Sequence, residues 1–118
     1  MSIPVFSHGA CLAHDTGPGH AESPARLKAV CEALKASFPD LDWHDAPRAS
    51  RGQLLRVHAE SLLHAVLETR PHERIWLDPD TVLSPASPEA GLRAAGAVVA
   101  AVETVLNGEA KRAFCAVR

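Results

Sequence analysis

Residues 87–117 of this chain read SPEAGLRAAGAVVAAVETVLNGEAKRAFCAV, and this stretch decides the fold class. Serine, proline and glutamate at 87–89 favour the start of a helix, and the Asn-Gly pair at 107–108 is typical of a helix end. The middle of this helix, residues 94–102, is apolar on nearly every side, so we expect other elements to cover both of its faces. The run RAFCAV at 112–117 then predicts a buried strand.

The sequence before residue 87 also alternates strands with helices. Short apolar runs predict strands at 3–6 and 41–44, and helical spacing predicts helices over 24–38, from Ser50 to a bend near His58, and over 60–68. Ser23 is a favourable N-cap for the first helix, and Pro39 ends it. Residues 70–87 contain three prolines and are expected to form a long irregular loop. This order predicts an α/β fold with a parallel sheet.

The end of the chain is unusual for a free-standing domain. A helix that is apolar all round needs cover on both faces, and a buried strand at the last residues needs neighbours on both sides. We therefore expect residues 1–118 to be one segment of a larger single domain.

The composition restricts the partners and the compartment. Twelve basic residues are outnumbered by fourteen acidic ones and form no dense cluster, which argues against a nucleic-acid partner. The N-terminus lacks the pattern of a secretory signal, and the longest apolar run is too short to span a bilayer. Three widely spaced cysteines with no CxxC pair suit reduced thiols. Together these features predict a soluble, cytoplasmic protein without a membrane partner.

A polar loop precedes the first long helix. Residues 14–27 read HDTGPGHAESPARL, with two histidines, two carboxylates and an arginine around a Gly-Pro-Gly turn. Three interpretations are open for these residue types: a metal site, a substrate loop, or a turn between a strand and a helix.

Three stretches together resemble the histone deacetylase superfamily, in its bacterial class II-like and acetylpolyamine amidohydrolase branches. They are HDTGPGHAESPARL at 14–27, LLRVHAESLLHAVL at 54–67, and the region from LDPDTVLSP at 77–85 through the Ala-rich helix to GEAKRAFCAVR at 108–118. The resemblance covers essentially the whole chain, and the order and spacing of the three blocks make it specific.

The resemblance implies an arginase-like, three-layer αβα fold with a parallel sheet, and a hydrolase that cleaves acetyl or other acyl amides. In that family, zinc is held by two aspartates and a histidine, a histidine pair moves protons, and a tyrosine usually polarises the carbonyl. Relatives continue beyond the FCAVR-like stretch with Pro-Pro-Gly-His-His, whereas this sequence ends at Arg118 and contains no tyrosine. The resemblance thus implies an N-terminal segment, 1–118, without catalytic or metal-binding residues and inactive by itself; the zinc would belong to the full-length parent.

The family's substrate-rim aspartate matches Asp80, which would orient the substrate through hydrogen bonds. Two alternatives remain open: Asp80 caps its own loop, or Asp78 is the rim residue. His20 and Glu22 match positions near the rim, with Ala21 in place of the family's usual proline. Arg26 matches an arginine that lines an interior channel and binds backbone carbonyls; the alternative is a solvated arginine on the first helical turn.

A structural zinc is known at the His20 position in one eukaryotic branch of the family, and Cys11 and His14 lie nearby in sequence. The branch's further cysteine ligand, ahead of the aspartate loop, has no counterpart in HERIWLDPD at 72–80. Since a structural zinc normally takes four ligands including thiolates, we expect no metal in this chain.

The function that the resemblance implies is that of a zinc-dependent deacetylase or amidohydrolase acting on acetyl-lysine, acetylated polyamines or similar amines. The alternative is a non-catalytic α/β binding module derived from the same family. As a segment, the chain is expected to expose apolar surface on its last helix and strand and to self-associate through it.

Overall fold

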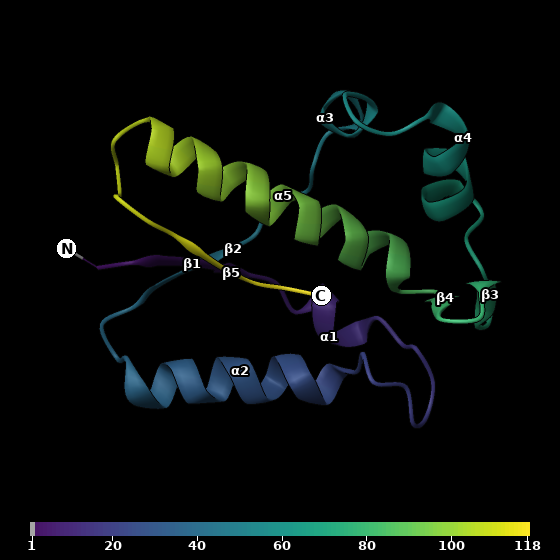
Figure 1. The fold of residues 1–118 in the computed structure, drawn as a ribbon, viewed down its shortest axis with the longest axis horizontal. Coiled ribbons are helices and arrows are strands. Elements are labelled where there is room, and N and C mark those ends of the chain that lie inside the picture. Colours follow the sequence, from purple (N-terminus) through teal and green to yellow (C-terminus); the bar gives the residue numbers. More distant parts are fainter. Residues whose placement is uncertain (1) are drawn as a thin grey trace.

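The computed structural model describes residues 2–118 and contains a three-stranded parallel sheet. Its strands are β1 (Pro4–Ser7), β2 (Asp42–Asp45) and β5 (Phe114–Ala116), in the order β2-β1-β5. Val5 of the central strand lies opposite Trp43 on one side and Phe114 on the other. Figure 1 shows the sheet between two long helices, α2 below and α5 above, so the α/β class and the layered parallel arrangement are confirmed.

Helix α2 (Pro24–Ser37) and the short helix α1 (Ala10–Ala13) cover one face of the sheet. Ser23 is the N-cap residue of α2 and Pro24 opens the helix as predicted, although the Ser23 side chain makes no capping hydrogen bond. The core on this face consists of the buried residues Val5, Cys11, Leu27 and Ala116. Apolar side chains from a strand, two helices and the last strand thus hold this layer together.

Helix α5 (Ser87–Leu106) covers the other face. Its buried residues Ala97 and Ala101 pack with Phe6 and Ala46. The successive β1 residues Val5 and Phe6 therefore enter different cores, which is why the strand is apolar on both faces at these two positions. The predicted helix end at Asn107 is confirmed.

Residues 94–102 are covered on one face only, so the expected cover on both faces is absent within residues 2–118, whereas the apolar surface expected to be exposed on the last helix of a segment is confirmed. Val98 and Val102 keep 51% and 50% of their surface exposed, and Leu106 keeps 80%. With Val105 they form a row at helical spacing, which we call the α5 apolar stripe. Even so, no helix among residues 2–118 is long and apolar enough to cross a membrane.

The connection from β2 to α5 passes through α3 (Arg51–Leu55), α4 (Glu60–Leu63) and a π-helical turn, η1 (His64–Glu68). Ser50 and Gln53 form a reciprocal capping box at the start of α3. The expected bend near His58 separates α3 from α4, so this part of the prediction is confirmed.

The long loop predicted at 70–87 is partly wrong, because it contains an antiparallel hairpin. Strand β3 (Ile75–Asp78) pairs with β4 (Thr81–Leu83), with a register irregularity between Trp76 and Asp78. Pro79 lies in the turn, where its missing N–H costs no ladder hydrogen bond. The hairpin carries Asp80 at its tip.

Candidate functional site

The candidate site is built around residues 14–23, which join α1 to α2 and are called the rim loop below. Gly17 has φ +92°, a conformation that favours glycine, and its N–H donates to Asp15 Oδ1 at 2.9 Å. The other oxygen of Asp15 accepts from Arg74 Nε at 2.8 Å. The Gly-Pro-Gly turn is therefore held from inside the loop and from the segment before β3.

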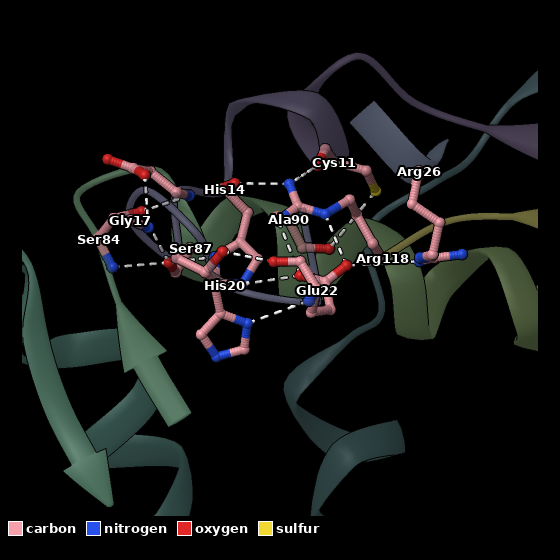
Figure 2. A network of polar contacts seen from close by, with 12 residues as sticks. Cys11, His14, Gly17, His20, Glu22, Arg26, Ser84, Ser87, Ala90 and Arg118 are labelled. Carbon is pink, nitrogen blue, oxygen red and sulfur yellow. Dashed lines mark hydrogen bonds and ion pairs between the residues drawn. The ribbon is translucent and has the colours of Figure 1, made fainter. Parts of the chain in front are cut away.

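Arg118 anchors the rim loop through its side chain, a role that the sequence pattern did not predict. Its side chain is fully buried, at 0% exposure. Its Nε and Nη2 donate to the two oxygens of Glu22 at 2.8 and 2.7 Å, while Nη1 donates to the carbonyls of Cys11 and His14 (Figure 2). This two-point pairing is the geometry that favours arginine over lysine.

Glu22 was predicted at the rim, and the structure places it at the centre of the anchor. Besides Arg118, its carboxylate lies 3.4 Å from Arg26 and 3.9 Å from His14 Nε2. Hydrogen bonds from Arg118 are the main cause that lowers the pKa of Glu22, against a smaller opposing effect of burial. Glu22 is thus an ionised structural partner whose oxygens are already engaged.

Arg26, predicted to line a channel and bind carbonyls, lies on the first turn of α2 with half of its side chain exposed. Its partner in this structure is Glu22. The contacts to backbone carbonyls are made by Arg118 instead. The channel assignment of Arg26 remains a prediction.

His20 joins the rim loop to the hairpin. Its Nδ1 accepts from the backbone N–H of Glu22, and its Nε2 lies 3.0 Å from the backbone carbonyl of Asp80. A carbonyl only accepts, so Nε2 must carry the proton and donate. The two contacts together therefore fix the neutral imidazole with its proton on Nε2.

The two aspartates at the hairpin tip, Asp78 and Asp80, differ in their hydrogen bonds. Asp78 Oδ1 accepts from the backbone N–H of Asp80 at 2.8 Å, and this bond is the main cause that lowers the pKa of Asp78. No hydrogen bond or ion pair to the carboxylate of Asp80 is found within residues 2–118, and this residue is exposed. Loop capping is therefore done by Asp78, which leaves the Asp80 carboxylate available for a ligand.

A second polar cluster ties the rim loop to the start of α5. His14 Nδ1 lies 2.6 Å from Ser87 Oγ, and the backbone N–H of Asp15 donates to Ser84 Oγ at 3.0 Å. The two buried serine hydroxyls are 2.9 Å apart. Burial and, next, the positive charge of Arg118 lower the pKa of His14, which favours the neutral imidazole.

The donor atoms present do not form a zinc site. Both ring nitrogens of His20 are already hydrogen-bonded, and the Cys11 thiol is buried with its sulfur 4.0 Å from the Ala90 carbonyl. Across residues 2–118 no group of three or more His, Cys, Asp or Glu side chains could hold a metal ion.

Residues 20–118 match the family model of the histone deacetylase domain. The chain belongs to the histone deacetylase family. It is 32% identical to a histone deacetylase-like amidohydrolase of Pseudomonas aeruginosa, over 97% of this chain and 30% of that protein. It is 29% identical to histone deacetylase 8 of Arabidopsis thaliana, over 98% of this chain and 36% of that protein.

Solved structures agree with this assignment. The chain matches the crystal structure of the HDA15 HD domain with a TM-score of 0.90 and 25% identity, covering 98% of this chain and 36% of that one. The deacetylase-like α/β fold predicted from the sequence is thereby confirmed. The chain spans about a third of the length of each of these three proteins.

The Glu22–Arg118 pair predicts a dependence of stability on acid. Because the pKa of folded Glu22 lies below its ordinary value of 4.5, the stabilisation is present above pH 4.5 and is lost as the pH falls through the folded-state pKa. We expect Glu22→Gln to lose less stability than wild type on acidification below pH 4.5, as measured by urea denaturation at a series of pH values. Glu32→Gln, at an exposed position on α2, should follow the wild-type profile. Parallel profiles for wild type and Glu22→Gln would contradict the assignment.

Proposed function

We propose that this chain is the N-terminal segment of a zinc-dependent deacetylase or amidohydrolase that hydrolyses acetyl or other acyl amides of lysine, polyamines or similar amines. The observation that carries the proposal is the match of residues 20–118 to the histone deacetylase domain. The arrangement of the segment supports it. Arg118 follows β5 and reaches the rim loop beyond the carboxyl end of β1, which is the edge where open parallel sheets bind ligands.

In this proposal the segment contributes the substrate rim and not the reaction centre. The carboxylate of Asp80 is unpaired within residues 2–118 and can accept hydrogen bonds from polar groups of the substrate. His20 and Glu22 support the rim from the loop side. Zinc would be held by residues of the parent outside 1–118, where it would polarise the amide carbonyl and acidify a water molecule.

The test compares two proteins with acetyl-lysine peptide and acetylated polyamine substrates. The full-length protein that carries this segment should hydrolyse at least one of them, and a chelator should abolish the activity. The 118-residue chain should show no turnover with added zinc. Lack of activity in a full-length protein loaded with zinc would contradict the proposal and favour the non-catalytic binding module.

The α5 apolar stripe gives the proposal a second test. We propose that the remainder of the parent covers this stripe and that the 118-residue chain self-associates through it. The double variant Val98→Lys/Val102→Lys should stay monomeric at concentrations where the wild-type chain associates, as measured by sedimentation velocity.

The matched control is Val57→Lys, since Val57 is 78% exposed but lies outside the stripe. This variant should associate like the wild-type chain. Equal association of all three proteins would place the contact elsewhere.

A further inference from the structure

We infer that His20 is a positioning residue that acts through Asp80, and that substrate affinity depends on the hydrogen bond from His20 to the hairpin tip. The inference rests on the proposed function and goes beyond it, because it assigns His20 a role without direct substrate contact. It is carried by the two ring contacts of His20, which join parts of the chain 60 residues apart.

The residue that orients His20 is itself held in place. Glu22, whose N–H donates to His20 Nδ1, is held at both carboxylate oxygens by the buried Arg118. The hydroxyl of buried Thr16 donates to the Glu22 carbonyl as well. The group that orients the imidazole is therefore fixed by its side chain and its backbone (Figure 2).

The second ring nitrogen of His20, Nε2, can donate only one hydrogen bond. With Nδ1 occupied as an acceptor, Nε2 is a donor, and it donates to the Asp80 carbonyl. The hairpin tip is otherwise held locally, by the bond from the Asp80 N–H to Asp78. His20 is thus the link between the tip and the rim loop.

The Asp80 carboxylate is carried by a backbone that is held in place. The backbone of Asp80 is bound on both sides, through its N–H and through its carbonyl, while its carboxylate is unpaired within residues 2–118. A charged acceptor fixed in advance binds a substrate donor without a further loss of conformational freedom. Loss of the His20 bond releases the tip and should weaken substrate binding while leaving the chemical step unchanged.

Two substitutions separate the two nitrogens of His20. In His20→Asn the side-chain oxygen can replace Nδ1 as acceptor for Glu22, but nothing reaches Asp80. In His20→Gln the amide nitrogen can extend to the Asp80 carbonyl in the manner of Nε2. In the full-length protein we expect His20→Asn to raise KM about fivefold with kcat unchanged, the size of one lost hydrogen bond. We expect His20→Gln to stay closer to wild type.

The decisive control repeats His20→Asn in an Asp80→Asn background. If His20 acts through the Asp80 carboxylate, His20→Asn adds no further rise in KM to that of Asp80→Asn. If the two residues act independently, the two increases in KM multiply. Thermal midpoints of all variants report any general loss of structure.

The outcomes distinguish this inference from the proposed function. A wild-type protein without deacetylase activity defeats the proposed function. An active wild type whose His20→Asn variant keeps its KM, or loses kcat instead, defeats the role of His20 alone. A multiplied KM effect in the Asp80→Asn background shows that His20 does not act through Asp80.

Discussion

Gly96→Ala is expected to lower the midpoint of thermal unfolding by roughly 10 °C, corresponding to about 3 kcal/mol. A Cβ at position 96 would lie 2.7 Å from the carbonyl carbon of Pro47 and 2.8 Å from the backbone nitrogen of Ala49, and still closer to the Pro47 carbonyl oxygen. These are backbone atoms, so no side chain can turn away to make room. The helix or the segment after β2 would have to move.

That movement would break the contacts that dock α5 on this segment. The Ala49 N–H donates to the Leu92 carbonyl at 2.9 Å, and Arg93 donates to the Ala46 carbonyl at 2.9 Å. Ala46 also belongs to the core between α5 and the sheet. The cost therefore includes lost hydrogen bonds and lost burial in addition to the overlap itself.

The matched control is Gly91→Ala on the same helix. A Cβ there has no neighbour within 4 Å, and the position is exposed. Alanine should raise stability by about 0.5–1 kcal/mol, because glycine inside a helix costs conformational entropy. Differential scanning calorimetry of both variants measures the contrast. A Gly96→Ala variant as stable as Gly91→Ala would show that α5 does not approach Pro47 closely.

The secondary structure followed from the sequence where local chemistry dominates. Pro24 and Ser87 mark the starts of the two long helices, and the apolar runs around Val5 and Cys115 mark the strands that they enclose. These signals act over a few residues, so a single sequence is enough to see them. The hairpin at 75–83 was missed because its strands are short and Pro79 suggested a loop.

The site could be predicted only in part, since its contacts join distant segments. The sequence points to His20, Glu22 and Asp80 through their resemblance to a family, yet the bond between His20 and the Asp80 carbonyl is a feature of the fold. Arg118 gave no local signal, because one arginine after an apolar strand is usually solvated. Glu22 was the one indication of this role, because a buried guanidinium requires a carboxylate as its partner.

The Glu22–Arg118 pair carries the second large prediction: Glu22→Ala is expected to destabilise the fold by about 3 kcal/mol. The substitution leaves the fully buried guanidinium of Arg118 without a counter-charge, although its bonds to two carbonyls remain. Glu22 keeps 38% of its side-chain surface exposed, which places the effect at the lower end of the range for buried pairs. Urea denaturation measures it.

The control uses the other arginine on the same carboxylate. Arg26 is half exposed and 3.4 Å from Glu22, so Arg26→Met should cost less than about 0.5 kcal/mol. The double variant Glu22→Leu/Arg118→Met removes both charges together and should be clearly more stable than the sum of its single variants implies. Additive losses would mean that the two side chains do not depend on each other. Because His20 is oriented by the backbone of Glu22, loss of this pair should also loosen the rim that presents Asp80.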